Sequence, residues 1–74
     1  MIDGYYIAYV RNKATKHEAP LGFFTTQDEA MMCVNMNRMK VGKDYETFYI
    51  VTDPNEFDFF RRVAHGEFGI QPSV

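Results

Sequence analysis

The sequence predicts one small α+β domain over residues 1–74, with the element order β-β-α-β-α. Two runs rich in aromatic and β-branched residues, at 5–11 and 45–52, are typical of strands that are buried on at least one side. Two helix-capping signals follow strand-like segments, at Thr26 and Asp53. A chain of 74 residues is about half of a typical domain of roughly 150 residues, so we expect a single hydrophobic core.

The first two strands are expected to form a hairpin with a long connection. Residues 5–11 (YYIAYVR) form the first strand, and residues 21–25 (LGFFT) form a short second strand. The segment between them, residues 12–20 (NKATKHEAP), is polar and contains Asn and Pro, which predicts a long, mobile loop. Gly22 lies where the second strand could bulge or approach another group closely.

The first helix is predicted to begin after Thr26. The Thr26 side chain can cap the helix, and Glu29 can return a hydrogen bond to the backbone amide of the capping residue. The helix is expected to continue to about residue 41, with basic residues in its last turn, where the helix dipole favours them. Gly42 suits the left-handed conformation that closes many helices.

A third strand and a second helix complete the predicted order. Residues 45–52 (YETFYIVT) alternate as a strand does. Asp53 then repeats the capping pattern, with Pro54 at the first helical position, so a short C-terminal helix should follow. We expect residues 67–74 to form a packed or frayed tail.

The connections predict a mostly antiparallel sheet in the strand order 2-1-3. A right-handed crossover through the first helix makes strands two and three parallel to each other. Strand one can then lie between them, antiparallel to both. The first helix covers one face of this sheet, and the pattern leaves open whether the second helix covers the same face.

Composition restricts the class of protein. Eight Lys and Arg against ten Asp and Glu give a net charge of -2, which excludes both a globally basic nucleic-acid binder and a highly acidic DNA mimic. The single cysteine, Cys33, cannot form an internal disulfide, which favours a reducing compartment. The apolar run at residues 5–10 is too short for a signal core or a membrane span. We therefore expect a cytoplasmic protein that does not bind membranes.

The first helix has an apolar stripe on each of two opposite sides. At about 100° per residue, five residues form its sheet-facing side: Ala30, Cys33, Val34, Asn37 and Val41. Met32, Met36 and Met39 fall on the opposite side, where a surface helix is normally polar. One interpretation is that phenylalanines of the C-terminal segment fold over these methionines: Phe57, Phe59, Phe60 and Phe68. The other is that the methionines form a partner-binding or dimer surface, because flexible methionines suit adaptable contacts.

Charge should separate between the two ends of the predicted sheet. Six of the eight basic residues fall at one end, beside His17, and form a candidate surface for steering an anion or a partner: Arg11, Lys13, Lys16, Arg38, Lys40 and Lys43. Glu18, Asp44 and Glu46 dilute this charge. The other end holds six acids, offset mainly by Arg61 and Arg62: Asp3, Asp28, Glu29, Asp53, Glu56 and Asp58. The charges either complement helix dipoles or meet phosphates or an acidic protein patch.

The sequence contains no recognisable catalytic or cofactor motif. His17, His65 and Cys33 lack a third orienting group and metal-ligand spacing, so we expect no catalytic residues and no metal site. Gly66 and Gly69 form a lone GxxG with no preceding strand, which does not predict a phosphate loop. We therefore expect a protein that is not an enzyme and has no cofactor.

Tyrosines on the predicted strands leave a nucleic-acid alternative open. The first strand places Tyr5 and Tyr9 on one face and Tyr6 on the other, and the third strand places Tyr45 and Tyr49 on one face. Exposed tyrosines on a sheet can stack the bases of single strands. The basic-aromatic pattern of RNA-recognition sheets is missing, so partial burial beneath a helix is the other interpretation.

The segment GFFTTQDEA, between two aromatic strands, resembles the strand-to-helix junction of small bacterial and phage β-β-α-β proteins. The matching residues are Gly22, Phe23, Phe24, Thr25 and Ala30, and the similarity extends over residues 5–52. The resemblance brings no catalytic residues and does not include the C-terminal helix. It implies a small accessory protein, encoded by a phage or a mobile element, that acts by contact.

These observations predict a non-catalytic interaction protein that binds and modulates a macromolecular partner, with inhibition implied by the resemblance alone. A protein partner is the first expectation, and a homodimer is compatible with it. One alternative is a protein that binds a nucleotide or another anion at a dimer interface, which would supply the cleft that so small a chain lacks. The other alternative is a single-stranded nucleic-acid binder that uses the sheet tyrosines.

Overall fold

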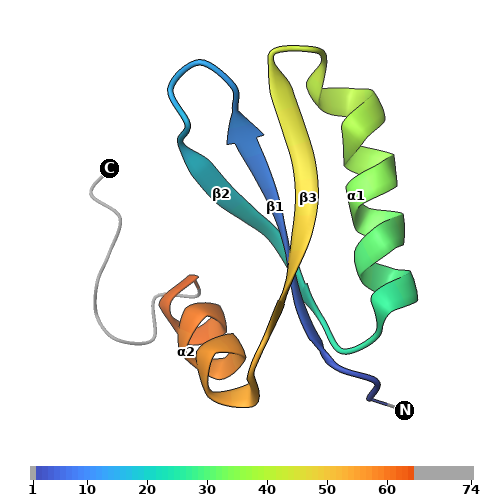
Figure 1. Cartoon of the computed structure of the whole chain (residues 1–74), viewed down its shortest axis with the longest axis vertical. Coiled ribbons are helices and arrows are strands. Elements are labelled where there is room, and N and C mark those ends of the chain that lie inside the picture. Colours follow the sequence, from blue (N-terminus) through green and yellow to red (C-terminus); the bar gives the residue numbers. More distant parts are fainter. Residues whose placement is uncertain (1, 65–74) are drawn as a thin grey trace.

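The computed structural model describes residues 2–64 and shows the predicted α+β order (Figure 1). The predicted tail and the residues His65, Gly66, Phe68 and Gly69 lie outside the described residues. The elements are β1 (Tyr5–Asn12), β2 (Glu18–Phe24), α1 (Gln27–Val41), β3 (Tyr45–Thr52) and α2 (Pro54–Ala64).

The three strands form one sheet in the order β2-β1-β3, as predicted. The central strand β1 is antiparallel to both neighbours, so β2 and β3 run in the same direction. Opposite residues of an antiparallel pair point to the same face, so the register assigns each side chain to a face. Ile7 pairs with Phe23 on one side and with Ile50 on the other, and these three residues share a face.

Helix α1 covers the opposite face of the sheet. Its residues Ala30 and Val34 are buried, as the predicted sheet-facing stripe requires, and they meet Tyr6, Ala8 and the buried Thr47. The Thr26 side chain accepts a hydrogen bond from the Glu29 backbone amide at 3.4 Å, so the first half of the predicted cap is present. The Glu29 carboxylate accepts from the Thr26 hydroxyl at 2.7 Å, where the prediction had the Thr26 backbone amide. The helix ends at Gly42, as predicted, and Gly42 has a positive φ of 77°. Its ψ of -175° differs from the predicted left-handed helical conformation, in which ψ is about +47°.

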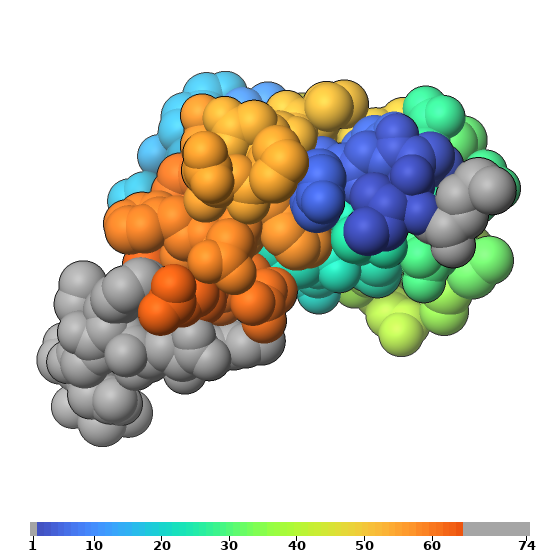
Figure 2. All heavy atoms as spheres, turned by 90° about the horizontal axis from the view of Figure 1, so that it is seen from below, coloured from blue at the N-terminus to red at the C-terminus, as the bar shows by residue number. Residues whose placement is uncertain are grey.

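Helix α2 lies on the other face of the sheet, the face of Ile7 (Figures 1 and 2). The Phe57 ring lies edge-on to Tyr5, with ring centroids 5.1 Å apart, and edge-on to Phe23, at 5.8 Å. None of the described residues of α2 is buried, and these two ring contacts of the half-buried Phe57 join the helix to β1 and β2. Seen from the end of the molecule where the N-terminus lies, α1 and α2 stand on opposite sides of β1 (Figure 2).

The hairpin loop is shorter than predicted. Strand β2 begins at Glu18, three residues earlier than the polar composition suggested, and only residues 13–17 connect the two strands. The Asn12 side chain accepts hydrogen bonds from the backbone amides of Ala14 at 2.9 Å and Thr15 at 3.0 Å. Lys16 takes a φ of 67°, which reverses the chain. A tight, side-chain-bonded turn therefore replaces the long, mobile loop that we expected.

Strand β2 bulges next to Gly22, where the sequence suggested irregularity. The pairing passes from Ala8 with Gly22 to Tyr9 with Pro20, so Leu21 is the additional residue. A Cβ atom on Gly22 would lie 2.6 Å from the Phe24 ring. The Phe24 ring therefore lies over Gly22, on the face of the sheet that α1 covers, and occupies the space that a side chain at position 22 would need.

Candidate functional site

The three predicted methionines are exposed on α1. Their exposed fractions are 63% for Met32, 55% for Met36 and 89% for Met39. Because α2 packs on the opposite face of the sheet, its phenylalanines do not cover these methionines. The interpretation that Phe57, Phe59 and Phe60 fold over the methionines is therefore wrong, and the fourth residue of that interpretation, Phe68, lies outside the described residues.

Two of the methionines form one wall of an apolar groove between α1 and the edge strand β2. The groove has a volume of about 310 Å³. Phe24 of β2 lines it across from α1, and Lys40 in the last turn of α1 also lines it. The lining residues are Phe24, Glu29, Met32, Cys33, Met36, Asn37 and Lys40. We call this set the methionine groove; Met39 lies outside it, one turn further along α1.

Polar contacts hold the floor of the methionine groove. The Asn37 side-chain amide donates a hydrogen bond to the Cys33 backbone carbonyl at 2.8 Å and lies 3.6 Å from the Cys33 sulfur. Both residues are half-buried. The sequence pattern assigned them to the sheet-facing side of the helix, but it gave no sign that Phe24 would complete the groove. The signal that could have found this wall is Gly22, two residues before Phe24 and on the same side of the strand.

The structure brings five of the six predicted basic residues to one end of the molecule as exposed side chains. The backbone amide of Lys13, in the β1–β2 turn, donates a hydrogen bond to the Asp44 carbonyl at 3.0 Å, which joins this turn to the α1–β3 turn. The last turn of α1 ends beside them (Figure 1). The exposed residues are Lys13, Lys16, Arg38, Lys40 and Lys43, and we call them the basic end. Lys40 belongs to both the basic end and the methionine groove.

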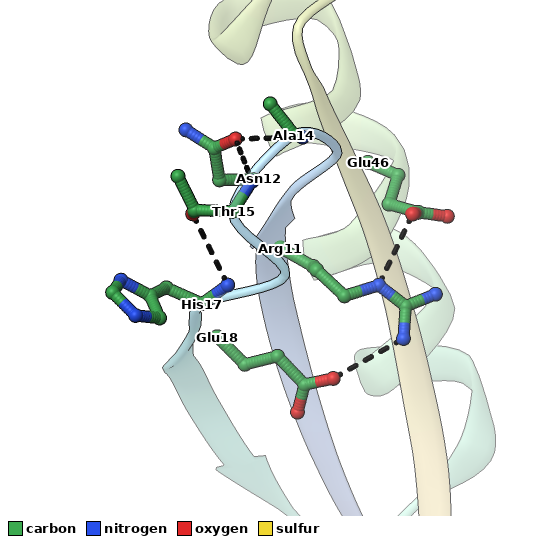
Figure 3. Close-up of polar contacts among 7 residues, drawn as sticks. All are labelled: Arg11, Asn12, Ala14, Thr15, His17, Glu18 and Glu46. Carbon is green, nitrogen blue, oxygen red and sulfur yellow. Dashed lines mark hydrogen bonds and ion pairs between the residues drawn. The ribbon is translucent and has the colours of Figure 1, made fainter.

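Arg11, the sixth predicted residue, is engaged by two carboxylates on the face of α2. Its Nε lies 3.1 Å from Glu46 of β3, and its Nη1 lies 3.2 Å from Glu18 of β2 (Figure 3). The guanidinium carbon also lies 4.8 Å from the centre of the Phe48 ring. The hydrogen bond to Arg11 holds the pKa of Glu46 below its ordinary value, and the same contact raises the pKa of Arg11. Arg11 therefore links the three strands, and its charge is offset locally.

Three of the acidic residues at the other end, Asp3, Asp53 and Asp58, have local partners. The Asp3 carboxylate accepts a hydrogen bond from the Gln27 backbone amide at 3.2 Å, which adds a second cap to α1. The Asp53 carboxylate accepts from the Glu56 amide at 2.7 Å and caps α2. Asp58 bonds to Arg61 at 3.0 Å, and this contact lowers its pKa. The contacts of Asp3 and Asp53 favour the helix-capping interpretation for these two acids, whereas Asp58 is held by an ion pair within α2.

The tyrosines are divided between the two faces of the sheet. Tyr5 packs on Phe57, and Tyr9 stacks on Phe48 with ring centroids 5.7 Å apart, both on the face of α2. On the face of α1, Tyr6 is buried and lies 5.8 Å from Tyr49, edge-on. The Tyr49 hydroxyl accepts a hydrogen bond from the Gln27 side chain at 2.9 Å. For Tyr5, Tyr6, Tyr9 and Tyr49 these contacts correspond to packing within the fold, which was the alternative to a base-stacking surface, whereas Tyr45 is 42% exposed.

The surface beside His17 offers little to an anion. A hollow of about 360 Å³ is lined there by His17, Asn12, Thr15 and Tyr45, but also by the Glu18 carboxylate. Within residues 2–64, no group of three or more His, Cys, Asp or Glu side chains is arranged to hold a metal ion. Neither helix of this part of the chain has the length and apolar character that a membrane crossing requires.

Comparisons with protein-family models, with curated proteins and with solved structures give no match to the chain. Function must therefore be argued from the surface itself.

Proposed function

We propose that the protein is a non-catalytic interaction protein that binds a protein partner through the methionine groove and modulates the activity of that partner. The observation that carries this proposal is the exposed apolar surface of Met32, Met36 and Met39 on a helix whose other side is already packed on the sheet. Exposed apolar surface of this kind is typical of contact sites. Methionine side chains also adapt to the shape of a partner at small conformational cost.

The charge beside the methionine groove indicates the chemistry of the partner. Lys40 lines the groove, and the other members of the basic end are exposed at the same end of the molecule. After Arg11, which is the main cause, Lys16 and Lys13 also help to lower the pKa of Glu46. A partner with an apolar ridge flanked by acidic residues would fit this arrangement. The ridge would bury the methionines, and the acids would meet the basic end and accelerate association.

The remaining parts of the proposal rest on sequence. The single cysteine favours a reducing compartment, which for this protein would be the cytoplasm. The resemblance to small phage and bacterial proteins supplies the direction of modulation, which is inhibition of the partner. It also supplies the proposed origin in a phage or a mobile element.

The test is selection from a displayed library of acidic amphipathic helical peptides, followed by affinity measurement of single peptides by fluorescence polarisation. The double variant Met32→Gln and Met36→Gln keeps side-chain length, helix propensity and charge. We expect it to bind the selected peptides at least roughly tenfold more weakly than the wild type, because the buried apolar contacts are lost. The triple variant Lys13→Glu, Lys16→Glu and Lys43→Glu should associate more slowly and lose the salt dependence of the wild type.

Val51→Lys, on the far edge of the sheet, is the matched control and should bind these peptides as the wild type does. A library that yields no binder, or binders that are indifferent to the Met32→Gln and Met36→Gln changes, would contradict the proposal.

A further inference from the structure

We infer that the outer edge of β3 pairs with the β3 strand of a second copy of this chain, so that two sheets join into one. This inference is independent of the proposed function, because it concerns the edge of the sheet opposite the methionine groove. Four observations support it: the regularity of this edge, its exposed apolar side chains, its charge pattern and a methionine on the neighbouring flank of α1.

The two edges of the sheet differ in how they are protected. An edge strand exposes unpaired backbone groups, and soluble proteins block such strands with proline, charge or a bulge. Strand β2 has all three, with Pro20, Glu18 and the bulge at Leu21. Strand β3 has neither a proline nor a bulge, and all eight residues from Tyr45 to Thr52 pair with β1 in one unbroken register. Within residues 2–64, β3 pairs with β1 alone, so its outer side is open.

Apolar side chains at the β3 edge are exposed on both faces of the sheet. Val51, on the face of α1, is 71% exposed, and Ile50, on the face of α2, is 38% exposed. A strand added at this edge would cover side chains on both faces at once, because opposite residues of neighbouring strands lie about 5 Å apart. Such cross-strand contacts between β-branched residues stabilise a sheet.

The charge pattern of β3 is compatible with pairing to itself. A two-fold axis perpendicular to the sheet makes two β3 strands antiparallel and keeps the α1 helices on one face. Paired residues of antiparallel strands point to the same face, so the axis must pass beside a residue that pairs with its own copy. Pairing over nearly the whole strand makes this residue Phe48 or Tyr49, the two central residues of β3. Glu46, the strand's one charged residue, then lies opposite Ile50 or Thr52 of the second copy, so two glutamates do not meet. Glu46 is also already paired with Arg11 of its own chain.

The flank of α1 nearest to β3 presents a further apolar residue. The methionine groove lies on the flank nearest to β2, because Phe24 of β2 forms its wall. At about 100° per residue, Met31 lies on the other flank, with Gln27, whose side chain bonds to Tyr49 of β3. Met31 is exposed. Pairing of two β3 strands would bring two α1 helices side by side and cover Met31, while the methionine groove would remain accessible.

Additional burial at the β3 edge would stabilise a chain whose own core is small. Among the described residues, Ile7 is the largest side chain that is fully buried. Domains of this size have a thin stability margin, which association of two chains can increase. A second copy is the occupant that the symmetry and charge of β3 favour, and a strand from a different protein is the outcome that the experiment must separate from it.

The first experiment measures solution mass by light scattering across a concentration series. We expect a dimer of the 8.7 kDa chain. Val51→Lys should weaken dimerisation by at least roughly tenfold, because a lysine on an edge opposes strand pairing and a solvated charge would be buried. The matched controls are Met39→Lys, which adds the same charge on the outer side of α1, and the Met32→Gln and Met36→Gln double variant. Both should dimerise as the wild type does.

The second experiment locates the axis by single cysteines at positions 48, 49, 50 and 51 in a Cys33→Ser background. A residue on the axis lies about 5 Å from its own copy, within disulfide reach, whereas its neighbours lie beyond that reach. We expect one position to form the crosslinked dimer much faster than the others. A monomer at every concentration would overturn the inference, and would leave a strand from another protein as the remaining occupant to test at this edge. A dimer that dissociates with the Met32→Gln and Met36→Gln changes but not with Val51→Lys would overturn it as well.

Discussion

The side-chain hydroxyl of Thr47 donates a hydrogen bond of 3.0 Å to the backbone carbonyl of Val34, in the middle of α1. Both residues are buried, and they belong to elements that follow one another in the chain. The contact joins α1 to β3 across the core. It therefore helps to set the position of the helix on the sheet, and with it the methionine groove on one flank and Met31 on the other.

Replacing Thr47 with valine should reduce stability at nearly constant shape. The change removes the hydroxyl and its bond to Val34, and we expect the free energy of unfolding to fall by about 1 kcal/mol. Urea unfolding followed by circular dichroism measures this loss. Thr15→Val is the control: it also removes a hydroxyl that accepts a hydrogen bond, from the His17 backbone amide at 3.3 Å, but in the exposed turn, and should change stability by less than about 0.5 kcal/mol. Equal effects of the two changes would show that the buried bond contributes nothing.

Truncation of Ile7 should be the most damaging single change in the apolar core. Its side chain is fully buried between the sheet and α2, so Ile7→Ala should cost about 2–5 kcal/mol and Ile7→Val about 0.5–1.5 kcal/mol. For a domain of this size the alanine variant would be largely unfolded. Thermal unfolding checks both values. Ile2→Ala, at an exposed position, should leave the melting temperature unchanged.

Helix α2 should detach when Phe57 is truncated. Phe57 contacts Tyr5 and Phe23, whereas the neighbouring Phe59 is exposed. Phe57→Ala should therefore lower hydrogen-exchange protection of the amides in α2, with less effect on β1. Phe59→Ala supplies the control, since it removes the same side chain from an exposed position. An equal loss of protection in α2 for both variants would show that Phe57 does not hold this helix on the sheet.

Gly42→Ala tests the backbone conformation at the end of α1. Gly42 has a φ of 77° and a ψ of -175°, a region that L-residues avoid, and a Cβ atom there would meet nothing within 4 Å. We expect a loss of about 1–3 kcal/mol from backbone strain alone. In a chemically synthesised chain, D-alanine at position 42 should retain wild-type stability, because it favours positive φ. Destabilisation by both alanine enantiomers would mean that strain is not the cause.

Stability should fall as the pH is lowered into the acid range. Arg11 and Arg61 are the main causes of the lowered pKa values of Glu46 and Asp58 in the folded state. The two pairs therefore stabilise the fold above the ordinary carboxyl pKa values of about 4, and this stabilisation is lost as the pH falls through the lowered folded values. Melting temperatures between neutral pH and about pH 3 measure the effect.

The Arg11→Gln variant should show a weaker dependence of its melting temperature on pH in this acid window, because Glu46 would titrate near its ordinary value in both states. Arg38→Gln removes the same charge from an exposed position and should keep the wild-type slope. An unchanged slope in the Arg11→Gln variant would show that the pair with Glu46 does not contribute.

Local sequence signals predicted most element boundaries. Thr26 and Gly42 bound α1 as expected, because capping requires particular side chains and backbone angles at particular positions. The β1–β2 turn was predicted less well. Its polar composition suggested a long loop. The Asn12 side chain instead accepts hydrogen bonds from two backbone amides of the turn, and strand pairing continues up to Arg11 with Glu18. Composition does not report which polar side chain will bond to the backbone.

The sequence by itself determined the order of the strands and helices, the strand order β2-β1-β3 and the position of Met32, Met36 and Met39 on the side of α1 away from the sheet, because these follow from hydrophobic period, capping and the handedness of the crossover. It left open whether the C-terminal phenylalanines cover these methionines. Only the tertiary structure decided which face α2 covers and what surrounds Arg11. Both depend on contacts between distant residues, Phe57 with Tyr5 and Arg11 with Glu46, whose partners are set by strand register. The exposure of Ile50 and Val51 at the outer edge of β3 likewise comes from the tertiary structure.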